Sequence, residues 1–453
     1  MAKQPANKST RMKKTIIIVV AALIILVFVG LYFLLAPKTI PGITVSQSGL
    51  LPNSGNQSGI TGGNAIPATG TSTSTTPPAN SISSDQVINY FETTPGTIIT
   101  VQPDGQINLI AGAESQTLSN ITLADINSTA FSPHGSRILI NFGTPSNPQT
   151  SIFNITLKTW TPLPMGMISP AWSRWDDRIA YLKQNGGGTE TIAILNGLRP
   201  KAAPQALLTL HAQDLSVAWI DKTHLAVSTK PSAFYPGSLW SLDINSRVFY
   251  PEILNTNGLQ TLWSGVAITN IAPPGLQFSS GAMGFGGNLS LINTSGNTVQ
   301  NLTFDTLPSK CVFAVETSTV AAVPSAATAA GASPNTPSGT SAAPSSTTPS
   351  IRTKTAATVA PAATTTSTPY LYCGVPRNQS TLSFARLPDD YDQMALYTID
   401  DVYQINLETG AITTVFNSPS QNFDVSKPKV FNNTFFFINR YDSKLYQMPI
   451  PTQ

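Results

Sequence analysis

The sequence predicts an all-β fold, a β-propeller of about seven four-stranded blades that follows a single N-terminal transmembrane helix. The first supporting observation is a recurring hairpin phrase. In this phrase a strand ends in a small and an aromatic residue, a tight polar turn follows, and a second apolar strand begins. The three clearest copies begin at Ala130, Ala171 and Ala218, and their aromatic residues are 41 and 47 residues apart. One propeller blade needs roughly 40 to 50 residues, so the spacing fits one copy per blade.

A second observation counts the blades. A short strand of alternating apolar residues recurs along the chain and is often closed by a polar turn. Seven such strands are found, at residues 98–101, 152–155, 192–195, 239–242, 289–292, 402–405 and 445–448. The last copy lacks a final strand, so we expect a segment near Ile82, or one further back in the predicted tether, to pair with the last blade and close the ring. Six blades with a flanking sheet, or eight blades, are the alternatives.

The N-terminal region is predicted to cross a membrane once. Residues 15–36 carry no charge and, at about 1.5 Å per residue, span roughly 33 Å as a helix. Five cations and no acids precede this segment, which places residues 1–14 in the cytoplasm and the propeller outside. A cleaved secretory signal is the alternative, but its apolar run would be only about 7 to 15 residues. We therefore expect a single-pass protein of the plasma or inner membrane.

Two low-complexity stretches accompany the predicted propeller, which spans residues 85–450. Residues 37–84 are rich in Gly, Ser, Thr, Asn and Pro and are predicted to be a disordered tether, because they cannot bury a core. Residues 317–369 are almost wholly Ala, Thr, Ser, Pro and Gly and are predicted to be a disordered insertion at a hairpin tip. A neutral loop expansion is the favoured interpretation of the insertion, and a stalk or partner-binding tail is the alternative.

The two cysteines of the sequence, Cys311 and Cys373, are predicted to form a disulfide. Both lie in the region expected outside the cell, where disulfides persist. Residues 310–314 and 370–375 have the pattern of the two strands of one repeat hairpin, which would place the thiols on neighbouring strands. Two buried free thiols are the alternative.

The first hairpin copy, residues 130–138, resembles the repeat of TolB-like and WD40-like propellers. The motif of that repeat is an aromatic residue, Ser, Pro, Asp, Gly, a basic residue and an aliphatic strand, and His134 stands here where the family favours Asp. The resemblance covers roughly residues 85–450 and implies the architecture but no particular activity. The aromatic residues of the copies are expected to pack in the core between blades: Phe131, Trp172, Trp219 and Trp263.

No catalytic, cofactor-binding or metal-binding constellation is predicted. The three histidines, His134, His211 and His224, lack the spacing of metal ligands. No Gly-x-Ser-x-Gly elbow of a hydrolase occurs. The acidic runs 389–392 and 400–401 do not match a calcium-binding loop and are interpreted as solvated turns.

The glycine-rich run 281–287 is the first candidate for a partner surface. It lacks the Lys-Ser or Lys-Thr of a phosphate-binding loop and precedes a strand rather than a helix. Together with residues 273–275 it is expected to form a long irregular connection at one mouth of the propeller. Loops on a rigid scaffold commonly carry recognition.

The net charge of the predicted extracytoplasmic part helps to exclude one class of function. The net charge is +3, but the predicted cytoplasmic tail contributes +5, which leaves about −2 for residues 15–453. Nucleic-acid binding is therefore not expected. We expect a non-catalytic binding or scaffold module for protein or cell-envelope ligands. The alternative is an enzyme that acts on an extracellular polymer such as a glycan, with carboxylates in the propeller channel.

Overall fold

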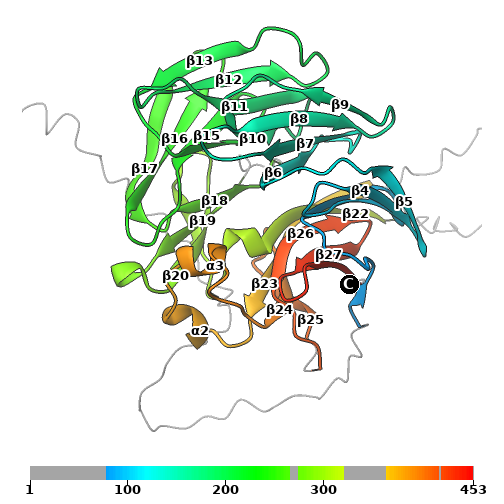
Figure 1. Cartoon of the computed structure of the whole chain (residues 1–453). Helices are drawn as coiled ribbons and strands as arrows, with labels where there is room; N and C mark the ends of the chain where they lie inside the picture. The colour runs from blue at the N-terminus through cyan, green and yellow to red at the C-terminus, as the bar shows by residue number, and fades with distance from the viewer. Residues whose placement is uncertain (1–77, 266–273, 321–363, 418–419, 452–453) are drawn as a thin grey trace, which may run out of the picture. The chain divides into compact units, whose positions relative to one another are not determined.

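The computed structural model describes residues 78–265, 274–320, 364–417 and 420–451. The chain divides into two compact units, residues 1–48 and 49–453, and every described residue belongs to the second. Seven four-stranded antiparallel sheets form the blades of a propeller (Figure 1), which confirms the predicted fold class and blade number. The predicted membrane anchor lies outside the described residues. Within the described ranges, no helix has the length and apolarity needed to cross a bilayer.

The first four blades are consecutive meanders in which each strand pairs with the next. Alternating or continuous apolar residues bury the middle strands of each blade, as the apolar runs predict. Their strands are β2 (Asn89–Thr94), β3 (Thr97–Val101), β4 (Ile107–Ala111) and β5 (Glu114–Ser119); β6 (Ile126–Phe131), β7 (Arg137–Phe142), β8 (Gln149–Asn154) and β9 (Thr159–Pro162); β10 (Met167–Trp172), β11 (Arg178–Gln184), β12 (Glu190–Asn196) and β13 (Gln205–Leu210); β14 (Leu215–Trp219), β15 (His224–Thr229), β16 (Pro236–Asp243) and β17 (Phe249–Asn257).

The last three blades follow the same order, and only the seventh recruits a distant strand. Helices are few among the described residues, namely α2 (Ser380–Ser383), α3 (Asp389–Asp392) and the 3₁₀ turns η1 (Ala282–Gly284) and η2 (Pro308–Lys310). The strands are β18 (Gln260–Trp263), β19 (Gly275–Ser280), β20 (Gly287–Ile292) and β21 (Thr298–Asn301); β22 (Cys311–Val320), β23 (Thr364–Pro376), β24 (Asp400–Asn406) and β25 (Ile412–Phe416); β26 (Val425–Phe431), β27 (Thr434–Asn439), β28 (Lys444–Pro449) and β1 (Asn80–Ser81).

The N-terminal strand β1 closes the seventh blade. It pairs antiparallel with β28, with Asn80 opposite Gln447. The backbone N–H of Ile82 then donates to the Leu445 carbonyl at 2.9 Å, and the Leu445 N–H donates to the Ser83 hydroxyl at 2.9 Å. The closure expected near Ile82 is thereby confirmed.

One of the seven counted strands has a different place from the others. Residues 98–101 fall in β3, the second strand of the first blade, whereas the other six counted segments fall in third strands. The third strand of the first blade is β4. The count of seven is correct because each blade still contributes one counted strand.

The tight turn of the first hairpin copy explains its residue types. The Ser132 hydroxyl accepts a hydrogen bond from the Arg137 N–H at 3.1 Å, and the Ser132 N–H donates to the Arg137 carbonyl at 2.9 Å. Gly135 adopts a φ of +63°, and a Cβ there would lie 2.2 Å from Cε1 of Phe91. Both the left-handed conformation and this close approach require glycine.

The repeated aromatic residues pack between neighbouring blades, as expected. Trp172, Trp219 and Trp263 are buried, and Phe131 is partly buried. Each ring belongs to an apolar cluster that joins its own blade to the preceding one. These rings are therefore part of the scaffold.

The sixth blade begins with a long hairpin that a disulfide joins near its base. Cys311 and Cys373 are direct register partners on β22 and β23. Their Cα atoms are 4.1 Å apart and their sulfur atoms are bonded at 2.10 Å. The two strands extend into the predicted insertion at both ends, up to the pair Val320 and Thr364. Residues 321–363 lie outside the described ranges.

Candidate binding channel

A large cavity lies along the first strands of the blades. Its volume is about 590 Å³. Residues of β2, β6, β10, β18, β22 and β26, the first strands of six blades, contribute to its lining. A second cavity of about 270 Å³ includes residues of β14, the first strand of the fourth blade. Leu262, Pro308 and Ser309 line both cavities, so the two are adjacent.

Aromatic side chains from three neighbouring blades line one part of the larger cavity. The ring of Phe91 on β2 stacks on Phe131 of β6 with centroids 5.4 Å apart. The same ring meets Phe431 of β26 edge-on, also at 5.4 Å. Phe313 and Val312 of β22 add to the apolar lining. This part of the cavity can accommodate apolar groups of a ligand.

Lys429 on β26 brings a cationic group to this aromatic wall. Its Nζ donates to Oδ1 of Asn89 at 3.0 Å and to the carbonyl of Tyr90. The ammonium lies 4.7 Å from the ring centre of Tyr90 and 5.2 Å from that of Phe131. Asn89 in turn donates to the hydroxyl and the carbonyl of Thr129, at 2.8 Å each, which ties the first blade to the second.

Two further cations, Lys427 and Arg174, line the same cavity. Lys427 Nζ donates to the Ile88 carbonyl at 2.7 Å, and Arg174 Nη1 donates to the Ser264 carbonyl at 2.7 Å. A register shift between Ser426 and Lys429 and a φ of +49° at Lys427 make this stretch of β26 irregular. Bulges of this kind redirect side chains, and here they accompany two lysines that both reach the cavity.

Burial lowers the pKa of all three cations, and two of them also act on the third. Desolvation lowers the pKa of Lys429 to about 7, and the like charges of Lys427 and Arg174 act in the same direction. Desolvation also lowers the pKa of Lys427 and of Arg174. No Asp or Glu occurs in the described lining of the larger cavity. The cavity is thus a positively charged site in a region whose net charge is slightly negative.

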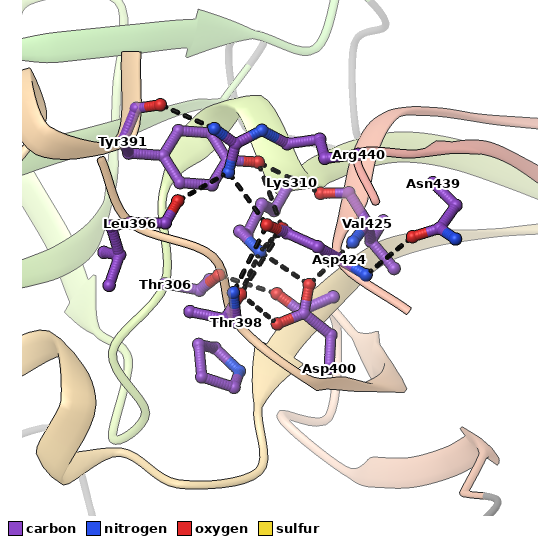
Figure 2. A network of polar contacts seen from close by, with 12 residues as sticks. Thr306, Lys310, Tyr391, Leu396, Thr398, Asp400, Asp424, Val425, Asn439 and Arg440 are labelled. Atoms are coloured by element: carbon purple, nitrogen blue, oxygen red, sulfur yellow. Dashed lines mark hydrogen bonds and ion pairs between the residues drawn. The ribbon is translucent and has the colours of Figure 1, made fainter. Parts of the chain in front are cut away.

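A buried ionic network holds the wall of the channel next to Pro308 and Ser309. Lys310 is 1% exposed, and its Nζ lies 2.6 Å from Oδ2 of Asp400, Oδ1 of Asp424 and Oγ1 of Thr398 (Figure 2). Desolvation opposes its charge, yet the pKa of Lys310 lies above its ordinary value because Asp400, Tyr391 and Asp424 face it. The network fixes η2 against the sixth and seventh blades.

Arg440 supplies the second cation of this network. Its Nη1 lies 2.8 Å from Oδ2 of Asp424, and its Nη2 donates to the Tyr391 carbonyl at 2.7 Å. The guanidinium centre lies 3.7 Å from the ring centre of Tyr391 (Figure 2). Two cations and two carboxylates balance in the interior, so this network is better explained as support for the fold than as a ligand site.

The acidic runs singled out in the sequence lie in or next to this network. Asp400 is fully buried in it, and Asp401 pairs with Arg377 at 2.8 Å. The interpretation of residues 400–401 as a solvated turn is therefore wrong. Both residues begin the strand β24, and both carboxylates are buried and paired with a cation. Asp389–Asp392 forms α3, and Asp389 accepts a hydrogen bond from the Ala233 N–H.

The described histidines and acids do not gather into a metal site. No group of three or more His, Cys, Asp or Glu residues able to hold a metal ion occurs in the described part of the chain. His224 instead contacts Asp221 through Nδ1 at 2.8 Å, within a turn of the third hairpin copy.

The glycine-rich run lies away from the two channel cavities. Met283 is 88% exposed at a φ of +57°. The Gly286 N–H donates to Ala385 and the Leu387 N–H donates to Gly284, so the segment between β23 and β24 supports this loop. Neither lining includes residues of the run. Pro273 lies outside the described residues.

Sequence reasoning missed the three channel cations. Arg174 follows the small, aromatic and Ser positions of the second hairpin copy, where the first copy has Pro133. Lys427 and Lys429 flank Pro428 within a strand. Charged residues in or next to the first strand of a blade were an available signal, because that strand faces the axis.

The fold and its axial cavity define a seven-bladed β-propeller closed by its N-terminal strand. No protein-family model matches the sequence, and no curated protein matches it. Among solved structures it is similar to TolB from Acinetobacter baumannii, with 13% identity and a TM-score of 0.33 over 46% of this chain and 52% of that one. The matched part of this protein therefore covers only about half of the TolB structure.

Two other solved structures are similar over more of the sequence. The β-propeller domain of the Trilobed protease from Pyrococcus furiosus is 8% identical, with a TM-score of 0.38 over 70% of this chain and 77% of that one. An oligogalacturonate lyase in complex with manganese is 8% identical, with a TM-score of 0.46 over 81% of this chain and 89% of that one. At these identities the likeness concerns the fold alone.

Proposed function

We propose that the protein is a membrane-anchored, extracytoplasmic binding protein whose propeller receives a ligand in its central channel. The observation that supports this most directly is the cavity of about 590 Å³, which first strands of six blades line together. Ligand sites of proteins commonly have roughly 300 to 1,000 Å³, apolar walls and a few placed polar groups. The channel has each of these properties.

The volume of the cavity also limits the size of the ligand. A cavity of about 590 Å³ suits a small molecule or a short segment of a partner, and not a folded domain. We therefore propose that a partner protein or envelope polymer inserts an end or a loop.

The alternative proposal, a glycan-active enzyme, needs two carboxylates that flank the scissile bond at roughly 5 to 10 Å from each other. The described lining of the larger cavity contains Arg174, Lys427 and Lys429 but no Asp or Glu. This composition favours binding over glycoside hydrolysis in the channel.

A steric variant tests the proposed binding site. Ser309 is exposed and lines both cavities, so Ser309→Trp should fill the channel. Envelope partners crosslinked to the full-length protein in its native membrane are identified by mass spectrometry, with Leu157→Trp as the control. Leu157 is 69% exposed and lines neither cavity. Loss of specific partners with Ser309→Trp alone supports the proposal, and equal capture by both variants contradicts it.

The proposed location has its own test. Single cysteines placed in residues 1–14 and at Lys201 are labelled in intact cells with a membrane-impermeant maleimide, and the native disulfide is kept because bonded cysteines do not react. Labelling at position 201 alone supports an extracytoplasmic propeller. Labelling at neither position without cell lysis contradicts it.

A further inference from the structure

We propose that the channel binds a carboxylate on an apolar peptide segment, with Arg174, Lys427 and Lys429 as the anion site. This inference rests on the proposed function and names the chemical class of its ligand. The carboxylate would be the C-terminus or an acidic side group of the inserted segment.

The three cations have no acidic partner within the protein. All 22 acidic residues of the sequence lie among the described residues, and none of them forms an ion pair with Arg174, Lys427 or Lys429. No side group outside the described ranges can therefore supply the missing negative charge. We therefore expect the neutralising carboxylate to come from another molecule.

The cations of the buried network, Lys310 and Arg440, have acidic partners. Lys310 and Arg440 each lie within 2.8 Å of a carboxylate oxygen. Each channel cation instead donates to a neutral oxygen, namely the Ser264 carbonyl, the Ile88 carbonyl and the Asn89 amide with the Tyr90 carbonyl. Lys427 and Arg174 are exposed, whereas Lys429 is partly buried, and desolvation acts on all three. Like charges repel one another most strongly where water is excluded, and an anion between them relieves that repulsion.

The apolar part of the ligand follows from the remaining lining. Phe91, Phe131 and Phe431 form one aromatic group beside Lys429. The adjacent cavity of about 270 Å³ extends the path along β14 and β18. A short extended peptide with an acid next to apolar side chains uses both the cations and the wall, whereas inorganic phosphate uses only the cations.

The binding is expected to depend on pH. Lys429 faces the cations Lys427 and Arg174 and the phenol of Tyr90, and no carboxylate lies among its contacts. Because the pKa of Lys429 is about 7, the free site loses one positive charge as the pH rises above 7. An anion binds the protonated form more tightly, so affinity should fall between pH 6 and pH 9.

The test uses the purified full-length protein in mild detergent. The probe is a mixture of N-acetylated tetrapeptides of randomised apolar residues with a free C-terminal carboxylate, compared with the same mixture as C-terminal amides. Retained peptides are quantified by mass spectrometry. We expect the acids to be retained at least about tenfold more than the amides, because tenfold corresponds to about 1.4 kcal/mol and one charge-assisted hydrogen bond contributes at least that much.

Variants assign the effect to the site. Lys429→Met and Arg174→Met should each reduce retention of the acids about tenfold, and Lys429→Arg should restore it and abolish the fall between pH 6 and pH 9. Lys201→Met changes an exposed cation away from the cavity and should have no effect. Thermal melting of each variant verifies folding.

Three outcomes overturn the inference. Equal retention of acids and amides removes the role of the carboxylate. Full competition by inorganic phosphate at the concentration of the peptides removes the role of the apolar wall. If Lys201→Met reduces retention as much as Lys429→Met does, the peptides do not bind at the channel cations. In each case, partner capture that is still blocked by Ser309→Trp would leave the proposed function intact.

Discussion

Lys310 shows how a single residue can hold two blades together. It is buried between Asp400, at the start of β24, and Asp424, which directly precedes β26. Removing one member of such a network leaves unpaired charge in the interior, whereas the intact network is close to balanced.

We expect Lys310→Met to lower the free energy of unfolding by about 3 to 5 kcal/mol, because two buried carboxylates lose their ammonium partner. Urea denaturation of the full-length protein measures the change. The exposed cation Lys201 provides the matched control, and Lys201→Met should change stability by no more than about 0.5 kcal/mol. Equal effects of the two variants would show that the network contributes little.

Lys429 predicts a pH dependence of stability. Its pKa is about 7 in the folded protein and about 10.4 when unfolded, so between these values the unfolded state binds more protons. Its contribution to stability therefore rises with pH across this window, is complete above about pH 10.4, and is lost as the pH falls through 7. Relative to Lys429→Met, the parent protein should gain stability from pH 7 to pH 10 in urea titrations. A difference that stays constant with pH would refute a depressed pKa.

At the scale of an element, the β22–β23 hairpin depends on its disulfide. Cys311 and Cys373 are 62 residues apart in sequence, so the bond removes much of the freedom of the unfolded state. A loop of this size is worth between about 3 and 5 kcal/mol in the loop-entropy model.

We expect the double variant Cys311→Ser, Cys373→Ser to lose about 3 to 5 kcal/mol of unfolding free energy. A reducing agent should destabilise the parent protein by the same amount and leave the variant unchanged. Urea denaturation with and without dithiothreitol measures both. If the reductant shifts both proteins alike, the effect does not come from this bond.

At the scale of the whole molecule, the ring is closed by very few residues. β1 contributes two residues to the seventh blade, and Ala79, Ser83 and Val87 are buried next to it. A variant beginning at Pro78 should therefore be more stable than one beginning at Gln86 by at least about 2 kcal/mol, because several hydrogen bonds of about 1 kcal/mol each are lost. Thermal melting compares the two variants. Identical melting temperatures would show that closure by β1 adds no stability.

Sequence reasoning predicted the architecture because blades repeat locally. Each hairpin copy carries its own turn chemistry, as at Ser132 and Gly135, and the disulfide followed from strand neighbours within one blade. The channel site and the Lys310 network depend instead on contacts between segments far apart in sequence. A bulge before Lys429 and the burial of Asp400 beneath the neighbouring blade are not encoded in any local pattern.

The pairing of Asn80 with Gln447 also determines when the ring can close during synthesis. Of the described strands, β1 is made first and its partner β28 is made last. During synthesis β1 stays unpaired until the strands between it and β28 have been made, and such distant pairings form slowly. Until β1 pairs, the edge strand β28 of the seventh blade is exposed in the newly made protein. At this stage β1 of one molecule can pair with β28 of another, which is an exchange of strands between two molecules.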